Sequence, residues 1–135
     1  MKIKLNIALF LSAALLLTAC ARDVYPKYLR MKQEAVWIEK SCKEGLASET
    51  RYVYKGSGAS IWITCKKPLD LRIWRGAFDE ELKKGNWLLK KPDVVTEIYC
   101  LGNEGISLLV TPAKANEDRS FVLSYPTNNC SILKN

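Results

Sequence analysis

The sequence predicts a small α+β domain in which one N-terminal helix packs on an antiparallel β-sheet or sandwich. Two observations predict this class. Apolar residues recur at helical spacing over residues 26–44, and after residue 49 the pattern changes to short runs of period two. With 135 residues and 48% hydrophobic content, the chain has the size and composition of one folded domain.

Residues 26–44 are the expected helix. Pro26 suits a first helical turn, and Gly45 suits the residue that follows a helix. A strand through Ala35–Glu39 is the competing interpretation, because this segment contains the strand-favouring Val36 and Trp37. The helix is favoured by one apolar stripe at spacings of three and four, formed by Tyr28, Met31, Ala35, Ile38 and Cys42.

The rest of the domain is expected to form short strands separated by turn residues. A hairpin is predicted over residues 51–65, with its turn at Gly56-Ser57-Gly58. A strand at residues 71–74 and one or two helical turns at residues 77–84 should follow. Further strands are predicted at residues 87–89, 94–101, 106–111 and 119–125. Short connections between successive strands favour an antiparallel sheet.

The first twenty residues have the order of an export signal that ends in a cysteine. Lys2 and Lys4 precede an uncharged apolar run from Ile7 to Leu17. Its eleven residues are fewer than the roughly 20 that span a bilayer. The sequence Leu17-Thr18-Ala19-Cys20 then resembles the lipobox of bacterial lipoproteins. An ordinary secretory signal with a chance cysteine is the alternative.

The lipobox resemblance implies a processing route and a location. A signal peptide of residues 1–19 would be removed, and Cys20 would carry diacylglycerol on its sulfur and an acyl chain such as palmitate on its amine. Ala21 is not the Asp that retains enterobacterial lipoproteins in the inner membrane, which implies an outer-membrane protein that faces the periplasm. Residues 20–25 would then be a lipidated tether, and residues 26–135 a single periplasmic domain.

Once Cys20 is assigned to the lipid, an even set of four cysteines remains. In an exported chain Cys42, Cys65, Cys100 and Cys130 predict two disulfides, for which three pairings are possible. The sequential pairing Cys42–Cys65 and Cys100–Cys130 is favoured as the simplest in a small meander. A four-cysteine zinc site is disfavoured, because such sites use closely spaced cysteine pairs.

The residues offer little catalytic chemistry. The chain has no histidine, which removes the usual serine and cysteine nucleophile systems and the near-neutral proton shuttle. Gly56-Ser57-Gly58 is a turn and not a nucleophile elbow. The acidic run Asp79-Glu80-Glu81 is better explained by the dipole at a helix N-terminus than by a hydrolase site. We therefore expect no enzyme, no metal site and no cofactor other than the lipid on Cys20.

The aromatic residues of the strands are the candidate binding residues. Trp, Tyr and Arg are the residue types enriched at binding hot spots. Strand alternation places Trp62 opposite its two isoleucine neighbours and places Trp74 on the same side as Arg72. Tyr52 and Tyr54 share a face of the neighbouring strand. The alternative is that the helix covers this face and makes both tryptophans core residues.

The charge of the chain limits its partners. Loss of Lys2 and Lys4 would reduce the formal net charge from +7 to +5. Lysine pairs at residues 66–67, 83–84 and 90–91 either cap element ends in solvent or form a basic rim that faces an acidic protein or an anionic lipid surface. Nucleic acid is not an expected partner in the periplasm.

In its general design the chain resembles the immunity lipoproteins of type VI secretion systems. The shared features are the lipobox, a short tether, about a hundred residues, four further cysteines and no catalytic set. This resemblance implies a lipid-anchored periplasmic protein that binds and neutralises a toxic effector, for example a phospholipase.

Two alternatives remain open. The ending Asn128-Asn129-Cys130-Ser131 is similar to the C-terminal cysteine turn of small periplasmic lysozyme inhibitors. The positive charge disfavours that function, since many lysozymes are themselves strongly basic. The other alternative is a structural accessory lipoprotein of a secretion or conjugation complex in the envelope.

Overall fold

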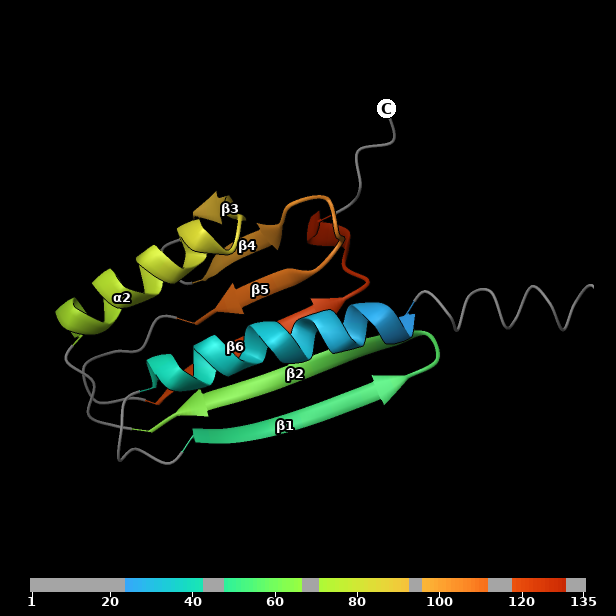
Figure 1. Ribbon diagram of the computed structural model, residues 1–135, viewed down its shortest axis with the longest axis horizontal. Coiled ribbons are helices and arrows are strands. Elements are labelled where there is room, and N and C mark those ends of the chain that lie inside the picture. The colour runs from blue at the N-terminus through green and yellow to red at the C-terminus, as the bar shows by residue number, and fades with distance from the viewer. Residues whose placement is uncertain (1–23, 43–47, 67–70, 93–95, 112–117, 131–135) are drawn as a thin grey trace, which may run out of the picture.

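The computed structural model describes residues 24–42, 48–66, 71–92, 96–111 and 118–130 (Figure 1). Six strands form one antiparallel sheet in the order β1-β2-β6-β5-β4-β3. The strands are β1 (Ser48–Lys55), β2 (Gly58–Cys65), β3 (Trp87–Pro92), β4 (Glu97–Leu101), β5 (Ser107–Val110) and β6 (Arg119–Tyr125). A helix over residues 24–41, the helix α2 (Leu71–Lys84) and the short 3-10 helix η1 (Asn128–Cys130) complete the fold. The predicted α+β class is confirmed, with a single sheet rather than a sandwich.

The N-terminal helix follows the predicted apolar stripe. Met31, Ala35, Ile38 and Cys42 have exposed fractions of 0–1% and face the sheet. The helix is already formed at Val24, which is also buried, so it includes two residues that the sequence analysis assigned to the tether. The strand alternative for Ala35–Glu39 is therefore excluded.

The second helix corrects the sequence analysis. Residues 71–74, predicted as a strand, are the first turn of α2, and the predicted helical turns at residues 77–84 are its continuation. Four residues are too few to distinguish a period of 2 from one of 3.6. Over the longer window, Leu71, Trp74, Phe78 and Leu82 recur at spacings of three and four, as in a helix.

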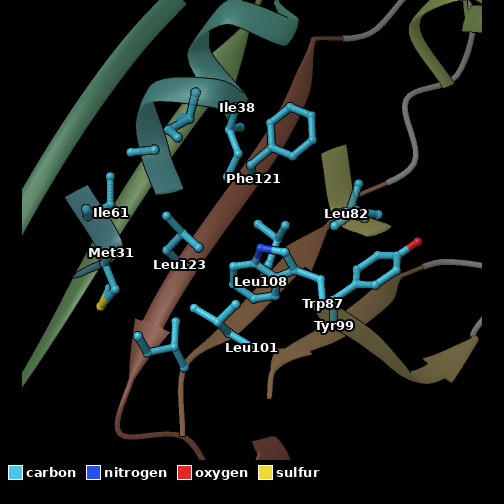
Figure 2. Close-up of a cluster of buried hydrophobic side chains, with 14 of the residues drawn as sticks. Met31, Ile38, Ile61, Leu82, Trp87, Tyr99, Leu101, Leu108, Phe121 and Leu123 are labelled. Carbon is cyan, nitrogen blue, oxygen red and sulfur yellow. The ribbon is translucent and has the colours of Figure 1, made fainter. Parts of the chain in front are cut away.

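Both helices pack on the same face of the sheet, which we call the covered face (Figure 1). The cross-strand partners Ile61, Leu123, Leu108 and Tyr99 lie on this face in four successive strands. Figure 2 shows Met31 and Ile38 over one part of this row and Leu82 over another. Phe78 of α2 is fully buried and contacts the Phe121 ring, with centroids 5.5 Å apart. One continuous core therefore joins both helices to the sheet.

Two disulfides tie the fold together, and they have the predicted pairing. Cys42–Cys65 joins the end of the first helix to β2, with Cα atoms 5.2 Å apart. Cys100–Cys130 joins β4 to η1, with Cα atoms 5.6 Å apart. In β2, Cys65 and Trp62 point to opposite faces of the sheet, because they are an odd number of residues apart. Cys100 is paired with Ser107 and not with a residue of the covered-face row. The two bridges therefore lie on opposite faces of the sheet.

Candidate binding surface

The face of the sheet opposite the two helices carries a half-exposed tryptophan on β2, the strand next to the β1 edge. In β2, Ile61 and Ile63 are completely buried, whereas Trp62 between them is 50% exposed. This alternation follows from the pleat of the strand, which points successive side chains to opposite faces. The Trp62 indole donates a hydrogen bond to Ser60 Oγ at 3.2 Å. The alternative that a helix buries Trp62 is therefore wrong.

An apolar row extends from Trp62 across the sheet. The strand registers pair Trp62 with Val122, Val122 with Leu109, and Leu109 with Ile98. Cross-strand partners share a face, so these four side chains form one row over four strands. Trp62 is half exposed, and the other three side chains of the row are partly exposed. We define the open face as this row with its neighbours on β1, β2 and β6, which are Glu49, Arg51, Val53, Lys55, Ser60, Thr64, Ser120 and Ser124.

The residues around the row are small and polar in the centre and charged at one border. Ser60 and Ser124 are paired on one side of the row, and Thr64 and Ser120 on the other. The charged members, Glu49, Arg51 and Lys55, all belong to the edge strand β1. The open face is thus uncharged in the middle and has a net positive border along β1, and Lys91 of the opposite edge strand is the register partner of Ile98. Such a surface suits a protein partner whose contact region is apolar and whose periphery is acidic.

A shallow hollow lies at the hairpin end of β1 and β2. Its volume is about 240 Å³, and it is open to solvent. The residues that line it are Val53, Lys55, Ser57, Gly58, Ala59 and Ser60. It adjoins the open face because Val53, Lys55 and Ser60 belong to both. The hollow could receive one side chain of a partner.

The structure divides the predicted binding residues between two faces. The register pairs Arg51 with Trp62 and Tyr52 with Ile61, so Tyr52 and Tyr54 lie on the helix side. Tyr52 donates a hydrogen bond to Glu39 at 3.2 Å, and burial, followed by this carboxylate, raises its pKa. Tyr54 contacts the Tyr28 ring at 5.1 Å. Hence these two tyrosines do not form one surface with Trp62.

The other two predicted binding residues, Arg72 and Trp74, belong to the first turn of α2 and not to a strand. The positions of their side chains lie outside the described part of the structure. The alternation that grouped them on a strand face therefore no longer applies. Of the five predicted residues, Trp62 alone is placed on the open face.

Two tryptophans that the sequence analysis did not single out hold a buried carboxylate. Glu34, 5% exposed, accepts hydrogen bonds from the indoles of Trp37 at 2.6 Å and Trp87 at 3.0 Å. Arg30 Nη1 lies 2.6 Å from the same carboxylate. The i, i+4 spacing of Arg30 and Glu34 can be seen in the sequence. Trp87 is 53 residues from Glu34 along the chain, so the sequence does not indicate their contact. This cluster fixes the first helix to β3.

A second polar cluster lies between α2 and β4. Arg75 binds both carboxylate oxygens of Glu97 at 3.0 and 2.9 Å, and it also contacts Asp79 at 3.0 Å and the Tyr99 hydroxyl at 3.1 Å. Burial would raise the pKa of Glu97, but hydrogen bonds from Tyr99 and Arg75 outweigh burial and hold this pKa below its ordinary value. Burial and the Glu97 hydrogen bond raise the pKa of Tyr99 to about 12.

The Arg75 cluster sets one guanidinium against two carboxylates and joins two elements of the covered face. Asp79 of the predicted acidic run belongs to this cluster and lies in the middle of α2, not at its N-terminus. Glu81 of the same run pairs with Lys84 at 2.9 Å. These contacts explain the acids as helix ion pairs, which corrects their assignment to a helix N-terminus.

The remaining predictions concern the lipidated Cys20, metal binding and the membrane. Cys20 and the rest of residues 1–23 lie outside the described residues. In the part of the chain that is described, no three His, Cys, Asp or Glu side chains are grouped so that they could hold a metal ion. Among the described helices, none combines the length and the apolar character needed to cross a membrane.

Comparison of the chain with protein-family models, with curated proteins and with solved structures finds no match in any of the three.

Proposed function

We propose that this chain is a lipid-anchored binding protein of the periplasm, and that it is an immunity protein that binds and neutralises a toxic secretion-system effector. The observation that carries the proposal is the one-sided sheet, whose open face has the apolar row of Trp62, Val122, Leu109 and Ile98. An exposed apolar patch with a polar rim is typical of a protein interaction site. The signal peptide would direct export and then be removed, and the lipid on Cys20 would hold this face at the outer membrane.

The charge of the chain favours an acidic effector. After loss of the signal peptide the formal net charge would be +5, and the charged border of the open face contains two basic residues against one acidic residue. Opposite charge on the effector would accelerate the encounter, while the apolar row would supply the slow dissociation. A phospholipase is one effector class that the resemblance to immunity lipoproteins suggests.

A competition experiment tests this proposal and requires no purified effector. A strain that lacks this chain is grown in dense contact with its parent, which delivers its own effectors. We expect the deletion strain to lose and to be rescued by the chain supplied in trans. It should also survive when the parent's secretion system is inactive. Equal survival of the deletion strain beside the active parent would contradict an immunity function.

The membrane anchor is tested separately by mass spectrometry of the mature protein. We expect the N-terminal residue to be Cys20 with diacylglycerol and an acyl chain attached. A Cys20→Ala variant should remain unprocessed and should not be recovered with the outer membrane. Processing at another residue, with an unmodified Cys20, would refute the anchor while leaving the competition result to decide the binding function.

A lysozyme turbidity assay separates the proposal from the inhibitor alternative. The purified chain is added to lysozyme acting on cell walls. We expect no change in the rate of clearing, because like charges oppose the encounter of this basic chain with a basic lysozyme. Inhibition at stoichiometric amounts would instead assign the chain to the lysozyme inhibitors.

A further inference from the structure

The end of the molecule at which the first helix begins is rich in tyrosine and lysine. Figure 1 shows the start of this helix beside the β1–β2 turn. Tyr54 lies at the end of β1, and its ring contacts Tyr25 at 5.9 Å and Tyr28 at 5.1 Å. On the neighbouring side, Lys27 Nζ lies 5.9 Å from the Tyr125 ring. We define the tyrosine–lysine end as Tyr25, Lys27, Tyr28, Tyr54, Lys55 and Tyr125.

This end exposes aromatic surface outside the buried core. Tyr25 is 52% exposed and Tyr54 42%, and Leu29 on the next turn of the helix is 42% exposed. Tyrosine rings of this kind, apolar along the body and polar at the tip, are enriched where proteins meet the headgroup region of a membrane. The exposed rings therefore fit a lipid surface better than open solvent.

The charge of this end is positive. Its charged members are lysines only, and Lys55 is solvent-exposed. Glu104 lies nearby in the turn next to Gly105, which packs against the Tyr125 ring, but Arg30 pairs with it at 3.6 Å. The lysines thus remain available to anionic headgroups, which can add about 1 kcal/mol of attraction per lysine close to the surface.

The reach of the chain places this end at the bilayer. Four peptide units separate Cys20 from Val24, so the two Cα atoms can be at most about 14 Å apart in any conformation. If Cys20 is the lipid anchor, the start of the helix must stay within that distance of the membrane surface. We propose that the tyrosine–lysine end is seated on the anionic headgroups of the membrane that holds the lipid. This inference rests on the anchor of the proposed function.

Seating at this end would set the direction of the open face. The first helix, β1 and β2 run along the long axis of the molecule, away from this end (Figure 1). Trp62 is four residues along β2 from Gly58 at the hairpin, which is about 13 Å of strand. The strands would then run away from the membrane surface, and the open face would point parallel to it. Trp62 would lie beyond the headgroups and be accessible to a periplasmic partner.

Vesicle binding of the chain that begins at Ala21, exported behind an ordinary signal, tests the seating without the lipid. All described core residues and both disulfides lie within residues 24–130, so this chain keeps the described fold. We expect it to bind vesicles of phosphatidylglycerol and phosphatidylcholine, and to bind neutral phosphatidylcholine vesicles much more weakly. No measurable binding to the anionic vesicles would overturn the inference.

Matched charge reversals locate the contact. Lys27→Glu with Lys55→Glu should weaken vesicle binding by at least roughly 25-fold, which is the loss expected from removing two lysines near the surface before the repulsion of the new carboxylates is counted. Lys40→Glu with Lys83→Glu makes the same change of net charge at two exposed lysines outside this end and should weaken binding by less than about fivefold. Equal losses in the two double variants would show unspecific attraction and overturn the inference.

A label on tyrosine tests the seating in the lipidated protein. The mature chain is labelled with 3-fluorotyrosine and reconstituted in vesicles that carry a spin label at the headgroups. We expect the fluorine signals of Tyr25 and Tyr54 to broaden, while that of Tyr99, 5% exposed in the core, stays sharp. Sharp signals from Tyr25 and Tyr54 in a protein with a modified Cys20 would overturn the seating and leave the anchor intact.

Discussion

The two faces of the sheet are formed by alternate residues of the same strands, and they differ in burial. On the covered face, Ile61, Ile63, Phe121 and Leu123 are completely buried beneath two helices. On the open face, the alternate residue Trp62 is half exposed. Burial of large side chains contributes most of the stability of a small domain, so the covered face supplies most of the apolar stabilisation of the fold. The residues of the open face are therefore less constrained by folding and can be suited to a partner.

The largest expected effect contrasts truncations on the two faces. Phe78→Ala should lower the free energy of unfolding by about 3–5 kcal/mol, because it leaves a cavity among Trp37, Tyr99 and Phe121. Val122→Ala on the open face should cost only about 1 kcal/mol. Urea denaturation measures both. Equal costs would show that the open face also supports the fold.

Removal of one disulfide from each face sharpens the comparison further. Cys42→Ala with Cys65→Ala, and Cys100→Ala with Cys130→Ala, should each cost about 3–4 kcal/mol, since the bridged positions are 23 and 30 residues apart. The first pair should cost more because its cysteines are 0–1% exposed, against 7% for the second, and alanines leave a cavity there. A larger loss from the second pair would contradict this order.

The buried carboxylate of the covered face gives the next effect. Glu34→Ala should cost about 2–4 kcal/mol, because it leaves the Trp37 and Trp87 indoles without their acceptor and removes the nearer of the two carboxylates that Arg30 contacts. Glu81→Ala removes a solvent-exposed pair with Lys84 and should cost under about 1 kcal/mol. Thermal unfolding of the two variants measures the difference, and similar melting temperatures would refute a structural role for Glu34.

A smaller, pH-dependent effect comes from Glu97. Because the folded protein holds the pKa of Glu97 below its ordinary value of 4.5, this group stabilises the fold above that pH. The stabilisation is lost as the pH falls through the lower pKa of the folded state. Glu97→Gln should therefore be less stable than the wild type at neutral pH and lose less stability on acidification. An unchanged slope of stability against pH would contradict this assignment.

Most of the fold could be predicted from the sequence, because its elements have long and regular patterns. The helical stripe from Met31 to Cys42, the last strand at residues 119–125 and the sequential pairing of cysteines are all present in the structure. The prediction of a strand at residues 71–74 was wrong because it considered only these four residues. The helical spacing appears only when Phe78 and Leu82 are included.

The composition of the open face was less predictable, because it depends on the length of one turn. The observed two-residue turn at Gly56-Ser57 pairs Arg51 with Trp62. A three-residue turn that included Gly58 would have paired Tyr52 with Trp62 and placed both on one face. The sequence also shows nothing of the row from Trp62 to Ile98, since it joins four strands that are distant along the chain.

The most direct test of the account compares two variants in the competition experiment. Trp62→Glu changes the open face, and Val36→Glu introduces the same charge at a residue of nearly equal exposure, 49% against 50%, on the first helix. Both should stay folded, with unfolding free energies within about 1 kcal/mol of the wild type. We predict that Val36→Glu protects the deletion strain from its parent and that Trp62→Glu does not. Full protection by a folded Trp62→Glu variant would contradict the assignment of the open face as the binding surface.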